Sequence, residues 1–79
     1  MVTVLRSGGL RIVIYLDDHE PAHVHVLGDG EAKIDLGAGS DEPVLIWSVG
    51  FSNADLRRAY RLVRDHRHAL IAQWREYHG

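Results

Sequence analysis

The stretch AHVHVLGDGEAKIDL, residues 22–36, decides the fold, because two segments that alternate polar and apolar residues flank a short turn with two glycines. Successive side chains of a β-strand point to opposite faces of its sheet. One face of the predicted hairpin is therefore apolar and carries Val24, Val26, Ala32, Ile34 and Leu36. The other face is polar and carries His23, His25, Glu31, Lys33 and Asp35.

The length of the turn sets the register of this hairpin. A three-residue loop, residues 28–30, places Val26 opposite Ala32 and keeps every apolar side chain of the two strands on one face. A two-residue turn would place that valine beside a lysine and mix the two faces. The three-residue loop is therefore predicted, and on the polar face it sets two pairs, His25 with Lys33 and His23 with Asp35.

Outside the hairpin, short apolar runs are separated by stretches rich in Gly, Asp, Ser and Pro, which are turn compositions. The runs predict strands at residues 2–5, 10–16, 22–27, 31–36 and 44–49. This order indicates an antiparallel meander of four or five strands. The number depends on whether residues 43–49 form a paired strand.

The C-terminal part changes to a helical period. Its apolar residues recur at steps of three and four and form one stripe: Leu56, Ala59, Tyr60, Val63, Leu70, Trp74 and Tyr77. Ser52 is the expected N-cap, with Asp55 three residues on and Phe51 placed to pack on Leu56. A lone helix buries such a stripe only against the sheet. We therefore predict an α+β fold with one long C-terminal helix on one sheet face.

The size and composition of the chain bound its class. Its 79 residues suffice for one compact domain, with residues 1–50 as the sheet and 51–79 as the helix. The absence of cysteine excludes disulfides, thiolate zinc sites and a cysteine nucleophile. No apolar run approaches the roughly 18 residues of a membrane span, and the N-terminus lacks the pattern of a signal peptide. A cytoplasmic protein without membrane contact is expected.

Two histidines on one side of a strand are a common way to offer nitrogen ligands to one metal ion. His23 and His25 have this spacing, and His19 in the preceding loop is the candidate third ligand, with Glu31 or Asp35 as alternatives. A divalent metal such as zinc is the cofactor that this set would take. Asp35, opposite His23, is the candidate for orienting that ring. The other interpretation is that both histidines are polar residues on a solvated face.

The basic charge of the chain is concentrated in its last third. Residues 52–79 carry six arginines against three acids, whereas residues 1–51 carry three basic side chains against eight acidic ones. The candidate contacts for a phosphate or an acidic partner are Arg57, Arg61, Arg64 and Arg67. Arg67 lies inside the apolar stripe, so it either extends along the rings of Tyr60 and Trp74 or reaches the sheet. His66, at the edge of the stripe, is expected to be partly buried with a hydrogen bond.

The segments VLRSGGLRIVIY, HEPAHVHV and GEAKIDL, followed by the C-terminal helix, resemble a small bacterial family called domain of unknown function 4160. The matching residues are Glu20, Pro21, His23, His25, Val26, Gly30, Glu31, Ala32, Val63, His66 and Trp74. Ala22 stands where relatives usually have a second proline, and PVLIWSV is longer and more apolar than the connection in many relatives. The resemblance implies a small cytosolic protein, often encoded beside another small protein, with pairing of the toxin–antitoxin type. It implies no established reaction.

Three functions remain in competition. The favoured one is a partner-binding protein of a toxin–antitoxin-like pair, acting through the polar sheet face or the arginines. The alternative is a small enzyme, a ribonuclease or metal-dependent phosphoesterase, that uses His23 and His25 as acid and base or as metal ligands. Nucleic-acid binding is less favoured, because no aromatic residues interleave the arginines. An open sheet face and strand edge also favour a homodimer or a bound small protein.

Overall fold

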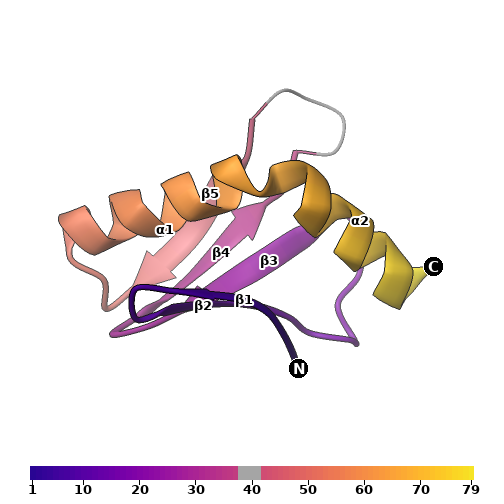
Figure 1. Ribbon diagram of the computed structural model, residues 1–79, viewed down its shortest axis with the longest axis horizontal. Helices are drawn as coiled ribbons and strands as arrows, with labels where there is room; N and C mark the ends of the chain where they lie inside the picture. The colour runs from indigo at the N-terminus through magenta and orange to yellow at the C-terminus, as the bar shows by residue number, and fades with distance from the viewer. Residues whose placement is uncertain (38–41) are drawn as a thin grey trace.

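The computed structural model describes residues 1–37 and 42–79, and these form five strands followed by two helices (Figure 1). The strands are β1 Val2–Ser7, β2 Leu10–Ile14, β3 His23–Leu27, β4 Glu31–Asp35 and β5 Val44–Val49. The helices are α1 Asn53–Asp65 and α2 Arg67–His78. Each strand pairs antiparallel with the next, in the order β1-β2-β3-β4-β5. The expected α+β meander is confirmed, and its last run is a paired strand.

The predicted register of the central hairpin is confirmed. Val26 lies opposite Ala32 and His23 opposite Asp35, and the Gly28 N–H donates to the Gly30 carbonyl oxygen across the three-residue turn at 3.0 Å. This register places the apolar side chains of β3 and β4 under the helices. It also places both histidines on the opposite face of the sheet.

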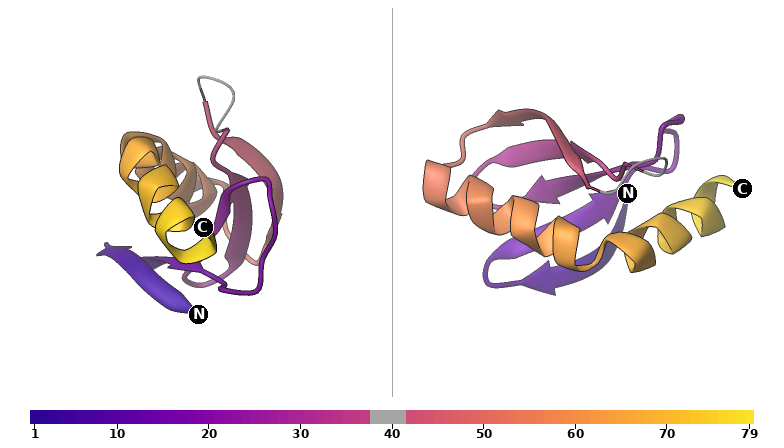
Figure 2. Two further views of the ribbon diagram at one scale, coloured as in Figure 1. Left: turned by 90° about the vertical axis from the view of Figure 1, so that its right-hand side faces the viewer. Right: turned by 90° about the horizontal axis from the view of Figure 1, so that it is seen from above.

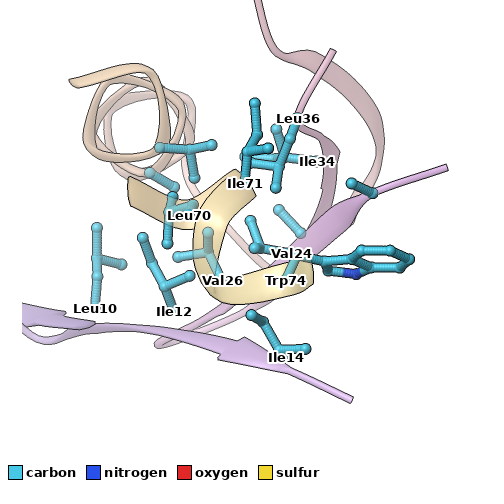
Figure 3. Packing of buried hydrophobic residues seen from close by; sticks show 14 residues of the cluster. Leu10, Ile12, Ile14, Val24, Val26, Ile34, Leu36, Leu70, Ile71 and Trp74 are labelled. Atoms are coloured by element: carbon cyan, nitrogen blue, oxygen red, sulfur yellow. The ribbon is translucent and has the colours of Figure 1, made fainter. Parts of the chain in front are cut away.

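Both helices cover the same face of a twisted sheet, as Figure 2 shows from two sides. The core between the layers draws side chains from β2, β3, β4 and both helices. Its largest fully buried members on the helix side are Ile12, Ile14, Val24, Val26, Ile34, Leu36 and Val63. Figure 3 shows Leu70, Ile71 and Trp74 of α2 packed among these strand residues.

The prediction of one long helix is wrong, because the helix breaks at His66. This residue has φ −113° and ψ 18°, and its backbone N–H bonds to the Val63 carbonyl oxygen at 3.2 Å. The sheet is twisted, so a straight helix would leave it after a few turns. The break lets α1 pack over β4 while α2 turns to pack against β3 (Figure 2).

The helix start follows the prediction. The Ser52 hydroxyl oxygen accepts the Asp55 backbone N–H at 3.1 Å, which satisfies one of the unpaired donors of the first turn. Phe51 and Leu56 both pack against the core. Neither helix in the described part of the chain is long and apolar enough to cross a lipid bilayer.

Replacement of Trp74 by alanine tests the placement of α2. The indole is 2% exposed within the core, so Trp74→Ala should lower the free energy of unfolding by about 3–5 kcal/mol. Tyr77→Ala is the matched control, because Tyr77 lies on the same helix and is exposed, and its loss should cost about 0.5 kcal/mol or less. Urea denaturation of both variants provides the measurement. Equal effects of the two substitutions would show that α2 is misplaced.

Candidate functional site

The helix-free face of β3 holds a buried cluster and is not a wet surface. His23 and His25 are 5% and 8% exposed, which contradicts the alternative interpretation that they are polar residues on a solvated face. The Tyr15 ring at the end of β2 contacts His25 edge-on, with ring centres 4.5 Å apart. Trp47 of β5 approaches the same imidazole at 5.8 Å. Aromatic side chains from both neighbouring regions of the sheet therefore enclose the pair.

Each buried imidazole is held through its Nδ1 atom. In His23 this nitrogen lies 2.9 Å from the Pro21 carbonyl oxygen, and in His25 it lies 3.0 Å from Oε2 of Glu31. Both partners are hydrogen-bond acceptors, so the two Nδ1 atoms donate. The rings are thereby fixed in orientation, with their Nε2 atoms free to face a third group.

That third group is Asp18, from the loop between β2 and β3. Its Oδ2 atom lies 2.8 Å from Nε2 of His23 and 3.6 Å from Nε2 of His25. One donor atom from each of the three residues lies within 4.8 Å of the others. Within residues 1–37 and 42–79 this is the set of side chains that has the composition and spacing to hold a metal ion.

Two of the sequence predictions for this site need correction. His19 is exposed and does not belong to the three-residue set, in which Asp18 stands instead. Asp35 lies opposite His23 in the register, but its Oδ1 accepts the Gly37 N–H at 2.7 Å. Both nitrogens of the His23 ring are engaged by other residues, so Asp18 contacts that ring where Asp35 was expected to. Strand alternation predicts which residues are neighbours across two strands. It does not predict which side chain of a loop lies over them.

Burial is the main influence on the pKa of the His25 imidazole. The low exposure of His25 lowers its pKa below the ordinary value of 6.5, against the opposing effects of the Glu31 hydrogen bond and the Asp18 charge. Burial, together with the charges of Glu31 and Asp18, raises the pKa of Tyr15 above 10.0. His25 is therefore a neutral imidazole at neutral pH, able to accept a proton or to bind a cation.

A cavity of about 340 Å³ adjoins the cluster and gives a ligand access to it. Residues 17–21 of the loop line this cavity together with His23, Lys33, Asp35 and Ile46 of the sheet. His19, although absent from the three-residue set, lines this cavity. Any molecule bound here would contact Asp18 and His23 and lie near the Lys33 ammonium group.

The predicted arginine surface divides into two parts. Arg57, Arg61 and Arg64 are exposed on α1, as a contact surface requires, and Arg64 lies 3.4 Å from Asp65. Arg67 is different, because its Nε atom donates to the Leu36 carbonyl oxygen at 2.7 Å and its guanidinium also bonds to Gly37. It is half-buried and ties the start of α2 to the end of β4, so its side chain has a structural role in the fold, and its contact with a partner stays a prediction.

His66, beside it, was expected to be partly buried with a hydrogen bond. It is exposed, and its Nδ1 atom bonds to the Leu62 carbonyl oxygen at 3.0 Å. Its side chain therefore stays on its own helix at the break and does not enter the core.

An exposed apolar strand is the feature that the sequence prediction missed. β5 is the last strand in the order and carries five large apolar side chains between 39% and 68% exposed: Val44, Leu45, Ile46, Trp47 and Val49. A register shift opposite Lys33 and Ile34 interrupts the alternation of this strand. The uninterrupted run VLIW in the sequence indicates this feature, because a strand with one buried face and one solvated face would alternate apolar and polar residues.

A pH titration tests the environment of His25. Its lowered pKa means that the unfolded chain binds a proton at this ring more readily than the folded chain does. The linked stability is fully present above pH 6.5 and is lost as the pH falls through the folded pKa. NMR titration of the ring protons should give His25 a pKa below 6.5, and His25→Asn should reduce the loss of stability on acidification. A His25 pKa of 6.5 or higher would contradict this account.

Comparison with known proteins places the chain in a family. Residues 9–75 match the model of one family, described as Domain of unknown function (DUF4160). Among curated proteins and among solved structures, none is significantly similar to this chain. The match spans most of the chain, including the central hairpin, the buried histidines and nearly all of both helices. The chain therefore belongs to the DUF4160 family.

Proposed function

We propose that this chain is a small partner-binding protein, one member of a pair of the toxin–antitoxin type, and that β5 is its contact strand. The observation that carries the proposal is the row of exposed apolar side chains on this edge strand. The polar face of the sheet is the other surface that the sequence offers for partner contact. Around His23 and His25 it is buried, so it offers a partner much less accessible surface there.

The outer edge of β5 is suited to strand addition. Within the described residues β5 pairs with β4 on one side, and the sheet order ends at its other side. An edge strand presents backbone N–H and C=O groups that another chain can pair with, and monomeric proteins usually protect such edges with charges. From Val44 to Val49 the strand has no charged side chain. An added strand would gain main-chain hydrogen bonds and bury the apolar side chains.

The partner that fits this edge is an extended, apolar segment of a second small protein. Apolar side chains at alternate positions of that segment would lie beside Ile46 and Trp47, whereas charged ones would be desolvated there. The exposed arginines of α1 lie on another element and are available to an acidic part of the same partner. Pairing of two copies through β5 is the competing arrangement.

A capture experiment with matched variants tests the proposal. Ile46→Lys places a charge on the contact strand at a side chain that is 50% exposed, so folding should be little affected. Leu16→Lys is the control, because Leu16 is 52% exposed and lies between β2 and β3, outside the contact strand. Tagged wild-type protein and the control should recover the same stoichiometric partner from the native host. Ile46→Lys should recover it about tenfold less or weaker.

Light scattering distinguishes binding of a different partner from pairing of two copies through β5. If purified wild-type protein dimerises in light scattering and Ile46→Lys does not, the occupant of the edge is a second copy. If neither partner recovery nor self-association depends on Ile46, the contact-strand proposal is wrong. Circular dichroism of each variant establishes that any loss is not caused by unfolding.

A small histidine-dependent enzyme, a ribonuclease or a metal-dependent phosphoesterase, is the second candidate. The cavity beside Asp18 and His23, with the Lys33 ammonium group on its wall, favours this function because a phosphate could be bound there. Hydrolysis of RNA or of a simple phosphodiester by the wild type, lost in His23→Asn and kept in Leu45→Lys, which lies on β5 outside the cavity, would support it. Absence of hydrolysis with and without added zinc would count against it.

A further inference from the structure

We propose that Asp18, His23 and His25 bind a divalent transition metal of the zinc class, through the Asp18 carboxylate and the two Nε2 atoms. This inference goes beyond partner binding and stands on the geometry of the cluster alone. It assigns to the site a ligand class and a set of donor atoms that differ from the set with His19 expected from the sequence.

The two Nδ1 atoms fix the orientation of the imidazole rings. Each donates its hydrogen to an acceptor, the Pro21 carbonyl oxygen or the Glu31 carboxylate. Metal-binding histidines have this arrangement, because a hydrogen bond at one ring nitrogen fixes the tautomer and leaves the lone pair of the other for the metal. Both rings have an acceptor at Nδ1, a backbone carbonyl for His23 and a carboxylate for His25, and their Nε2 atoms come from one strand and point to one place.

The remaining atoms of the cluster are the two Nε2 nitrogens and Oδ2 of Asp18. Nε2 of His23 lies at hydrogen-bond distance, 2.8 Å, from Asp18 Oδ2, and Nε2 of His25 lies 3.6 Å from the same oxygen. All three are atoms that can bind a metal, and they are directed at one place. A single proton can bridge Asp18 to one imidazole at a time. A metal cation can contact all three atoms together.

Burial strengthens the case for a metal. The His23 and His25 side chains are 6% and 10% exposed, whereas Asp18, at 27%, keeps a path to solvent through which an ion can enter. The groups that face His25 are Tyr15, Asp18, His23 and Glu31, and two of these are carboxyl groups that favour a cation in a poorly solvated site.

The donor set selects the class of metal. Two imidazole nitrogens and one carboxylate oxygen suit zinc and neighbouring transition metals, whereas magnesium and calcium take oxygen ligands. Zinc bonds of about 2.0–2.1 Å place tetrahedral ligand atoms roughly 3.3 Å from one another. Asp18 Oδ2 lies 2.8 Å and 3.6 Å from the two Nε2 atoms, which is close to this separation.

Three protein ligands leave a coordination position for another molecule. The adjacent cavity, with Asp18 and His23 on its wall, is the place from which water or a phosphate oxygen would reach it. Catalytic zinc sites have this composition of three protein ligands and one exchangeable ligand. The position of Lys33 on the same wall favours an anionic occupant.

Zinc titration by calorimetry tests the proposal on the purified full chain. Wild-type protein should bind one zinc ion per chain at neutral pH, and magnesium should give no heat. His23→Asn, His25→Asn and Asp18→Asn should each weaken zinc binding by about tenfold or more, because each removes a ligand while asparagine can keep the nearby hydrogen bond. His19→Asn is the matched control, since His19 is exposed next to the cluster, and it should bind zinc like the wild type.

A second readout does not depend on the variants folding. Cobalt added to the wild-type protein should give the absorption of a four-coordinate site, and zinc should displace it. Binding should weaken on acidification below the imidazole pKa of about 6.5, because protons compete for the ring nitrogens. The proposal fails if wild-type protein binds neither metal at neutral pH, or if His19→Asn weakens binding as much as His23→Asn. Leu45 lies on β5, is 39% exposed and is outside the lining of the adjacent cavity, so Leu45→Lys should weaken partner binding and leave zinc binding unchanged. Failure of the contact strand and failure of the metal site are therefore distinguishable.

Discussion

The register of the β3–β4 hairpin is the constraint on which the other features depend. A shift of β3 by one residue would move Val24 and Val26 to the face without helices, away from Ile34, and put His23 and His25 into the core. The observed register gives the helices an apolar surface to cover. It also places the two imidazoles side by side, where Asp18 and Glu31 can reach them. One turn of three residues therefore specifies both the core and the candidate site.

Sequence patterns predicted what depends on periodicity and missed what depends on tertiary contacts. Alternation gave the hairpin, and the Ser52 cap marked the helix start, because both are local. The break at His66 depends on sheet twist and on the Arg67 bonds to the end of β4. Its only local trace is that the apolar stripe skips from Val63 to Leu70. Likewise, histidine spacing indicated a site, but a loop conformation selected Asp18 over His19.

The two proposed surfaces meet at Trp47. This residue belongs to the exposed β5 strand, and its ring also covers His25 at a centre distance of 5.8 Å. A partner seated on β5 would contact the same indole that encloses the histidine cluster. Metal binding and partner binding would then influence each other if either one shifts that ring, and by linkage the effect would be equal in both directions.

The central claim is that a bound metal ion takes both Nε2 atoms as ligands, while the ring hydrogens stay on Nδ1, toward the Pro21 carbonyl oxygen in one ring and the Glu31 carboxylate in the other. Nitrogen-15 NMR of the histidine rings tests it most directly, because the two ring nitrogens have different shifts in each tautomer. At mildly alkaline pH with zinc present, the account predicts that His23 and His25 carry their hydrogens on Nδ1, with Nε2 shifts that change on adding the metal. Hydrogens on Nε2 in either ring, unchanged by zinc, would contradict it.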